Sequence, residues 1–234
     1  MSRKLRALLS EVDAVLLDFD GPVCSVFAGY PAHVVAADLV QALGKAGVAT
    51  AAIESEPDPI EVLRWVARED DEELTAAADQ ALTAAEVRAV ATAEPTPFSH
   101  DLIAAINRLN MPLVVVSNNS SACISAYLVA HGCNDMVRAV EGRPFADPGR
   151  MKPNPAVVLA AIADLGVTAD RCVLIGDSPS DMVAAASAGA RRVGYANREG
   201  KHSSLVEAGA EVIAASMGNI LDAFEQPDPT RGGP

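Results

Sequence analysis

Two aspartates separated by one residue, Asp18 and Asp20, follow a short apolar run at positions 14–17. In an extended segment, residues two apart point to the same side, so both carboxylates can face one site. One carboxylate can then act as a nucleophile while the other donates and accepts a proton. Gly21 comes next and permits a sharp turn away from the pair. Taken alone, two acids at a strand end are equally consistent with a turn or a helix cap.

Three further polar segments have the composition of a phosphate or metal site. Ser117 and Asn118 stand where a helix is expected to begin, and a helix N-terminus offers free backbone N–H groups to an anion. Lys152 follows a polar loop and has the charge needed to neutralise a phosphoryl group. Asp177 and Asp181 follow another apolar run, and hard oxygen ligands of this kind suit Mg²⁺. Each segment also has a simpler interpretation as a helix cap or a solvated side chain.

The elements that must position these residues alternate along the chain. Short apolar runs predict strands, and stretches with apolar residues at helical spacing lie between them. This alternation predicts an α/β fold with a doubly wound, mostly parallel sheet, in which ligands bind beyond the carboxyl ends of the strands. The predicted strands are 14–17, 111–116, 136–140, 171–175, 192–195 and 211–214, and the predicted helices of this part are 101–109, 121–130, 155–165 and 180–188.

The segment between about residues 30 and 94 breaks the alternation. It shows three helical stretches, at 33–43, 59–68 and 72–92, and no convincing strand. Proline-containing joints on both sides predict a small accessory domain inserted into the core. We therefore expect a discontinuous α/β core domain at 1–28 and 96–226, an all-helical domain at 29–95 and a disordered tail at 227–234.

Composition argues against several classes of protein. The net charge of −13 makes nonspecific nucleic-acid binding a poor hypothesis, because phosphate contacts need clustered lysines and arginines. No apolar run approaches the roughly 18–20 residues that a membrane span needs. The cysteines are scattered without a Cys-x-x-Cys pair, which argues against a zinc site or a disulfide framework and favours a cytoplasmic location. Since the chain repels anions at long range, phosphate chemistry would need cations within the site itself.

The order of the polar segments resembles the four-part signature of the haloacid dehalogenase superfamily, over about residues 14–224. The pattern is Asp-x-Asp at 18–20, Ser at 117, Lys-Pro at 152–153 and Gly-Asp-x-x-x-Asp at 176–181. Within the superfamily the chain resembles members of the phosphoglycolate phosphatase and β-phosphoglucomutase type. The resemblance implies a Rossmann-like α/β core with a helical cap domain inserted after the first core strand.

The resemblance also implies a catalytic role for each residue of the signature. Asp18 would attack phosphorus and form an aspartyl-phosphate, and Asp20 would protonate the leaving group and then activate water. Ser117 and Asn118 would bind the phosphoryl group. Lys152 would neutralise its charge and orient the nucleophile.

A Mg²⁺ site is implied in the same way. The ion would bind the carboxylates of Asp18 and Asp177 and the backbone carbonyl of Asp20, with Asp181 holding metal-bound water or the lysine from outside. The second aspartate also discriminates within the superfamily, because members resembling dehalogenases or phosphonatases lack it. Its presence favours phosphate-ester chemistry. Pro22 departs from the more usual Thr or Val and leaves the path of the turn open.

Residues near or within the expected cap are candidates for substrate contact: Phe27, Tyr30, His33, Arg64 and Arg68. A cap that closes over the site can exclude water and recognise the leaving group. An arginine could meet an anionic or hydroxyl-rich leaving group. For Arg64 and Arg68, however, pairing with neighbouring acids on a solvated helix face is the favoured interpretation, and for His33 packing at a helix start is favoured.

Three functions are consistent with these observations, and the leaving group and oligomeric state stay open in all of them. We expect a Mg²⁺-dependent phosphatase that hydrolyses a small phosphorylated metabolite, with no nucleic-acid or membrane partner. A sugar phosphomutase resembling β-phosphoglucomutase is the alternative, since the two differ in whether water reaches the phosphoenzyme. A non-catalytic binding protein on the same fold is the least favoured hypothesis, because every catalytic position holds a competent residue.

Overall fold

A six-stranded parallel sheet forms the centre of the computed structural model, which describes residues 3–226. Its strands are β1 (Ala14–Leu17), β4 (Leu113–Val116), β5 (Ala139–Glu141), β6 (Cys172–Gly176), β7 (Arg191–Tyr195) and β8 (Val212–Ala214). They lie in the order β5-β4-β1-β6-β7-β8, so the chain moves to one side of β1 and then to the other. Ligand sites form at such a reversal, beyond the carboxyl ends of the strands. The predicted α/β class is confirmed.

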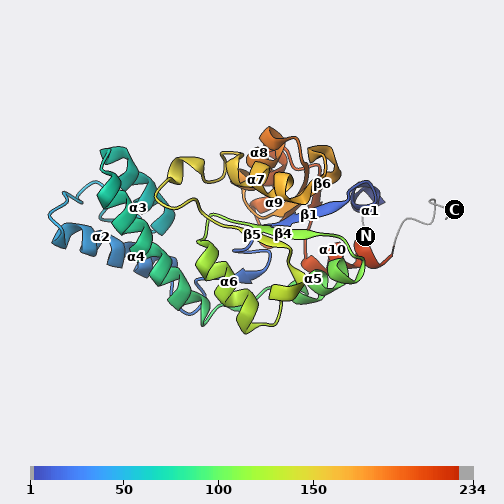
Figure 1. Ribbon diagram of the computed structural model, residues 1–234, viewed down its shortest axis with the longest axis horizontal. Helices are drawn as coiled ribbons and strands as arrows, with labels where there is room; N and C mark the ends of the chain where they lie inside the picture. The colour runs from blue at the N-terminus through green and yellow to red at the C-terminus, as the bar shows by residue number, and fades with distance from the viewer. Residues whose placement is uncertain (1–2, 227–234) are drawn as a thin grey trace.

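Helices cover both faces of the sheet (Figure 1). One face packs against α1 (Arg3–Leu9), α5 (Ser99–Arg108), α6 (Ser121–Ala130) and α10 (Met217–Glu225), and the other against α7 (Ala156–Leu165), α8 (Pro179–Ala188) and α9 (Lys201–Glu207). Val15 and Leu17 of β1 join the first apolar core, while Ala14 and Leu16 join the second. Burial on both faces explains why the central strands are continuous apolar runs rather than alternating ones.

Three helices between β2 (Cys24–Ser25) and β3 (Glu94–Pro95) form a separate layer: α2 (Ala32–Lys45), α3 (Pro59–Val66) and α4 (Glu72–Val90). We call residues 29–95 the helical insert. Its apolar side chains make a third core that includes Leu39, Leu63 and Leu82. In Figure 1 the insert lies at one end of the molecule, beyond the carboxyl ends of the strands and away from α1 and α10. Its independence as a domain stays a prediction.

Several elements differ from the sequence expectations. Helices α1, α9 and α10 were not predicted, because seven to nine residues show too few turns to establish a helical period. The two-residue strand β3 pairs antiparallel with β2 at the end of the insert, where no strand was expected. The predicted strand at 136–140 is displaced, since a 3₁₀ turn occupies Asn134–Met136 and β5 begins at Ala139. The predicted disordered tail at 227–234 lies outside the described residues.

Within residues 3–226, no helix is both long enough and apolar enough to cross a membrane. This finding agrees with the absence of a long apolar run in the sequence.

Candidate active site

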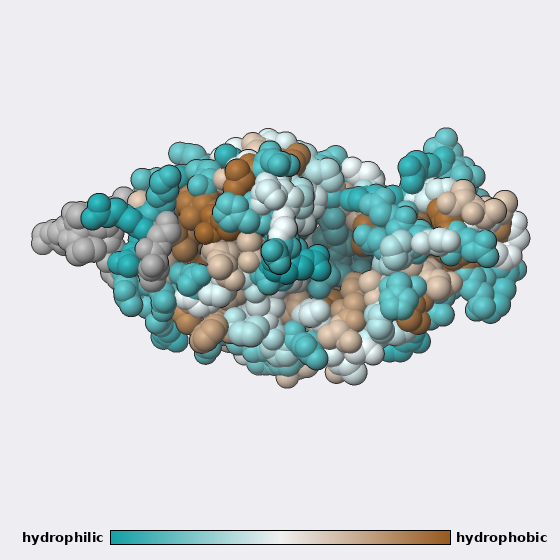
Figure 2. All heavy atoms as spheres, turned by 180° about the vertical axis from the view of Figure 1, so that it is seen from behind, coloured by the Kyte–Doolittle hydropathy of each residue, from teal (hydrophilic) through white to brown (hydrophobic). Residues whose placement is uncertain are grey.

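The sheet brings the predicted site residues to one edge. Asp18, Ser117 and Asp177 directly follow β1, β4 and β6, which are adjacent in the sheet. The backbone N–H of Asp18 donates to the carbonyl of Ile175 at 2.9 Å, so strand pairing fixes the position of this residue. A cavity of about 420 Å³ opens beside them, lined by Asp18, Asp20, Ser117, Asn118 and Lys152 and, from the other side, by Phe27, Pro59 and Arg64. The surface is correspondingly hollowed between the insert and the rest of the molecule (Figure 2).

The buried ammonium group of Lys152 is the centre of this edge. Its Nζ lies 2.7 Å from Asp18 Oδ1 and 2.5 Å from Asp181 Oδ1, and it donates to the carbonyl of Val116 at 3.0 Å. The side chain is only 2% exposed. Burial acts to lower the pKa of Lys152, but the two carboxylates outweigh it and raise that pKa above its usual value. The lysine therefore stays charged and joins the carboxyl ends of β1 and β4 to the first turn of α8.

The two aspartates of the first segment have different surroundings. Burial is the main cause that raises the pKa of Asp18, and the nearby charge of Asp181 adds to it, while Lys152 opposes both. A divalent cation among these carboxylates would reverse that shift. Burial also raises the pKa of Asp20, to about 6, against a backbone hydrogen bond from Val26 N to its Oδ1 at 3.0 Å. A carboxyl group in this range can release and take up a proton near neutral pH, as an acid–base catalyst must.

The donor set of a hard cation is present at the same place. Carboxylate oxygens of Asp18, Asp177 and Asp181 lie within 4.8 Å of one another, which fits the preference of Mg²⁺ for a few carboxylates. Both oxygens of Asp181 already have partners, since Oδ1 pairs with Lys152 and Oδ2 accepts from Ser178 N at 3.0 Å. Asp18 and Asp177 are therefore the better candidates for direct ligands. The outer position of Asp181 stays a prediction.

Two glycines allow this close approach of acidic side chains. A Cβ at Gly21 would overlap the carboxylate of Asp177, and a Cβ at Gly176 would overlap the side chain of Asp181. Gly21 also has a φ of +109°, which other residues rarely adopt. The turn after Asp20 thus needs a glycine for both space and backbone conformation.

The segment after β4 is held by its own side chains. Asn118 Oδ1 accepts from Lys152 N at 2.9 Å, and Asn118 Nδ2 donates to the Lys152 carbonyl at 3.1 Å. Asn118 therefore orients the lysine, and because it also lines the cavity, its contact with phosphate stays a prediction. Ser117 Oγ donates to Asn119 Oδ1 at 3.2 Å, and Ser120 caps α6 by accepting from Cys123 N. Ser117, Asn118 and Asn119 line the cavity, ahead of the start of α6 at Ser121.

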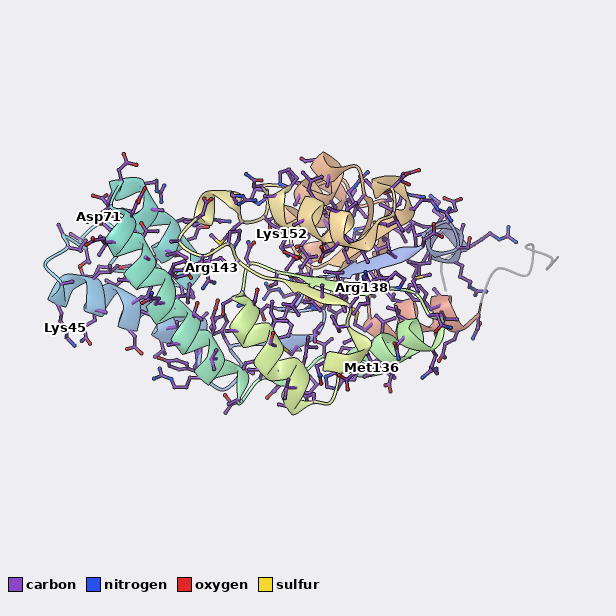
Figure 3. The ribbon with its side chains drawn as sticks, in the orientation of Figure 1. Lys45, Asp71, Met136, Arg138, Arg143 and Lys152 are labelled. Carbon is purple, nitrogen blue, oxygen red and sulfur yellow. The ribbon has the colours of Figure 1, made fainter. Side chains whose placement is uncertain are left out.

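A buried ion cluster that sequence reasoning missed joins this segment to the insert. Arg143, which is 6% exposed, lies 2.7 Å from Asp79 and 2.8 Å from Glu86, both on α4. Its Nη1 also donates to the carbonyl of Asn118 at 2.9 Å. Figure 3 shows Arg143 where α4 meets the loop after β5. The arginine therefore connects the insert, the sheet and the segment after β4.

Glu86 extends the cluster to the segment after β4. Its Oε2 accepts from Ser120 N at 3.0 Å, and its Oε1 accepts from Asn119 Nδ2 at 3.2 Å. Since Asn119 also bonds Ser117, a helix of the insert supports the predicted phosphate-binding serine through one intermediate. The available sequence signal was weak: Asp79 and Glu86 are two helical turns apart, so two acids share one face of α4.

The candidate substrate contacts from the insert region separate into two groups. Phe27 and Arg64 line the cavity, and Arg64 pairs with Glu61 at 2.5 Å, as favoured above, while also donating to the Lys152 carbonyl at 2.8 Å. Arg68 lines a neighbouring cleft of about 910 Å³ together with Arg64.

The other two candidates lie away from the cavity. Tyr30 donates to Asp38 at 2.5 Å in a different cavity, and His33 is exposed and does not line the candidate site. Substrate contact by any of them stays a prediction.

Comparison with known proteins decides the family. The family model described as haloacid dehalogenase-like hydrolase matches residues 12–189. The chain belongs to this family. The predictions of the superfamily, of its α/β fold and of a hydrolase-class enzyme are thereby confirmed.

Curated relatives of this haloacid dehalogenase-like chain include phosphoglycolate phosphatases. The protein of that name from Rhodospirillum rubrum is 31% identical over 146 residues, which are 62% of this chain and 59% of the relative. The one from Neisseria meningitidis is 26% identical over 137 residues, 58% of this chain and 57% of the relative. The matches thus span somewhat more than half of these relatives' length.

Solved structures share the fold over nearly the whole chain. CbbY from Rhodobacter sphaeroides, in complex with phosphate, has a TM-score of 0.67 at 19% identity and covers 92% of this chain and 100% of its own. A predicted phosphatase from Clostridium acetobutylicum has a TM-score of 0.68 at 17% identity and covers 92% of this chain and 98% of its own. At these identities the likeness establishes the fold.

The Arg143 cluster yields a stability prediction. Arg143→Met would leave the carboxylates of Asp79 and Glu86 buried without a cation, so the free energy of unfolding is expected to fall by about 3–5 kcal/mol. Urea denaturation measures this change. Arg138→Met serves as the matched control. It removes the same charge next to β5, where within residues 3–226 the arginine side chain makes only a long 3.5 Å bond to the backbone carbonyl of Asp164. Equal effects of the two substitutions would contradict the role given to the cluster.

Proposed function

We propose that the chain is a Mg²⁺-dependent phosphatase that hydrolyses a small phosphate monoester through an aspartyl-phosphate on Asp18. One observation carries the proposal: a buried cation holds Asp18 beside a cavity that also contains Asp20, whose pKa is raised independently. Two carboxyl groups with separate environments can divide the work of a nucleophile and a proton carrier. The names of the curated phosphoglycolate phosphatases agree with this reaction class.

The first half of the proposed reaction forms the phosphoenzyme. A carboxylate oxygen of Asp18 attacks phosphorus, the bond from phosphorus to the ester oxygen breaks, and that oxygen takes the proton of Asp20. Lys152 holds the nucleophile in place through its 2.7 Å ion pair and offsets the repulsion between two anions. Mg²⁺ held by Asp18, Asp177 and the backbone carbonyl of Asp20 would supply further positive charge for the phosphoryl oxygens. Ser117 would donate a hydrogen bond to one of them.

The second half regenerates the enzyme. Asp20, now ionised, takes a proton from a water molecule while the oxygen of that water attacks phosphorus. The bond between Asp18 and phosphorus breaks, inorganic phosphate leaves, and Asp20 is again protonated. A pKa near 6 suits both directions of this transfer at neutral pH.

The helical insert is proposed as the cap that recognises the leaving group. The cavity of about 420 Å³ between the insert and the strand ends has the size of a small-molecule site. Arg64 is the insert's cation at this cavity among the described residues, so an acidic or hydroxyl-rich leaving group is favoured. No contact within residues 3–226 specifically favours the phosphomutase alternative. The four cysteines are free and buried, and a reducing cytoplasm remains part of the proposal.

A panel of phosphate monoesters that includes 2-phosphoglycolate and several sugar phosphates tests the proposed activity. With Mg²⁺, we expect the protein to release phosphate from at least one ester, and excess EDTA to stop the reaction. Asp18→Asn should lower the rate by about 1000-fold or more, since it removes the nucleophile. Asp13→Asn is the control, because Asp13 lies exposed at the opposite end of β1 in an ion pair with Arg171. Retained activity in the Asp18 variant, or inactivity of the folded protein on every ester, would reject the proposal.

The role of Asp20 predicts a specific kinetic pattern. In Asp20→Asn, p-nitrophenyl phosphate should give a burst of about one p-nitrophenol per enzyme, because this leaving group needs no proton while breakdown lacks its base. An alkyl phosphate should give no burst in the same variant. In the unmodified protein, kcat/KM for the alkyl ester should fall as pH rises above about 6, since ionised Asp20 has no proton to donate. If the Asp20→Asn variant kept the decrease of kcat/KM at alkaline pH, the assignment of Asp20 as the proton donor would be contradicted.

A further inference from the structure

A second lysine reaches the proposed metal site from an unexpected element. Lys201 is the first residue of α9, and its Nζ forms an ion pair with Asp177 Oδ2. The two side chains are 16% and 11% exposed, so the pair is largely shielded from water. Asp177 is the carboxylate proposed above to bind Mg²⁺ directly. The same oxygen-bearing group thus has two candidate cations.

The position of Lys201 is built into the fold. Gly200 precedes the helix with a φ of +87°, a conformation that favours glycine and turns the chain into α9. Leu205 of α9 is fully buried in the apolar core that α9 shares with α7 and α8. The helix is therefore anchored by its apolar residue, and the side chain at its first position reaches Asp177, which follows β6.

Charge balance explains what this lysine does. Four carboxyl groups, those of Asp18, Asp20, Asp177 and Asp181, gather at this edge, and the ammonium of Lys152 contacts only the first and the last. Burial raises the pKa of Asp177, and its hydrogen bond and charge interaction with Lys201 oppose that rise. The positive charge of Lys201 also acts to lower the pKa of Asp20. Lys201 therefore supplies a cation in direct contact with Asp177, which Lys152 does not contact.

We propose that Lys201 is an internal counter-cation of the metal site, which holds the Asp177 carboxylate in the metal-free protein and competes with Mg²⁺ for it. The inference rests on the proposed function, because that proposal assigns Asp177 to the metal. An ammonium group and a divalent ion repel strongly at contact distances in a largely dry site. Binding of Mg²⁺ therefore requires Lys201 to leave the Asp177 oxygen. The affinity of the site for Mg²⁺ is then lower than the carboxylates alone would give.

Calorimetric titration with MgCl₂ tests this without measuring activity. Lys201→Met keeps the length of the side chain and removes its charge, and we expect the dissociation constant for Mg²⁺ to tighten by about tenfold or more. Lys201→Gln gives a second neutral variant should the first fail to fold. Lys201→Arg keeps the charge and should stay within about threefold of the unmodified protein. A residue with a purely structural role would weaken metal binding when replaced, so the direction of the change is the decisive reading.

Lys45→Met is the matched control for net charge. Lys45 lies on α2 at the far end of the insert, where it pairs with Gln41 at 3.0 Å (Figure 3). This variant should leave the Mg²⁺ dissociation constant unchanged. If the unmodified protein binds Mg²⁺ but the neutral Lys201 variants bind it equally or more weakly, the proposal for Lys201 is overturned and the phosphatase proposal stands. If neither the unmodified protein nor the neutral variants bind Mg²⁺, both proposals fail in their metal assignment.

Discussion

The buried ammonium group of Lys152 is the interaction on which the site depends. Asp18 and Asp181 come from different elements, and their carboxylates repel each other in a place with little water to screen them. One lysine between them makes the arrangement stable and fixes the position of the proposed nucleophile. Asn118 fixes the lysine in turn by bonding both of its backbone groups. The ends of β1 and β4 and the start of α8 are thus coupled through a single charge.

The helical insert faces the cavity and also helps to hold the segment after β4 in place. Its α4 supplies Asp79 and Glu86 to Arg143, and Glu86 also holds the backbone and side chain of the segment that follows β4. The position of the insert and the geometry of Ser117 are therefore linked through buried charges. These ion pairs are almost completely buried, and exposed ion pairs contribute little to stability by comparison. Helix α4 of the insert therefore supports the segment after β4.

The sequence predicted the parts of the fold and site that local patterns determine. The apolar runs before Asp18, Ser117 and Asp177 indicated buried parallel strands, and the strand ends then placed these side chains at one edge. Glycines after helices and acids at strand ends are signals carried by neighbouring residues.

The parts that were missed depend on contacts between distant residues. Lys201 meets Asp177 from the start of α9, and Arg143 meets Asp79 and Glu86 from the loop after β5. A lone lysine or arginine in a sequence is most often solvated, so nothing nearby marked these as buried. The bonds of Asn118 to Lys152 span 34 positions, so no local pattern indicated them. Its contact with phosphate stays a prediction.

The most direct test of the account is chemical identification of the phosphorylated residue. Turnover of a substrate ester is stopped with acid, and borohydride reduction then converts any aspartyl-phosphate into homoserine, which peptide mass spectrometry locates. The account predicts homoserine at position 18, dependent on both substrate and Mg²⁺. Homoserine at another carboxylate, or an active enzyme in which Asp18 is never converted although a control acyl phosphate is, would contradict it.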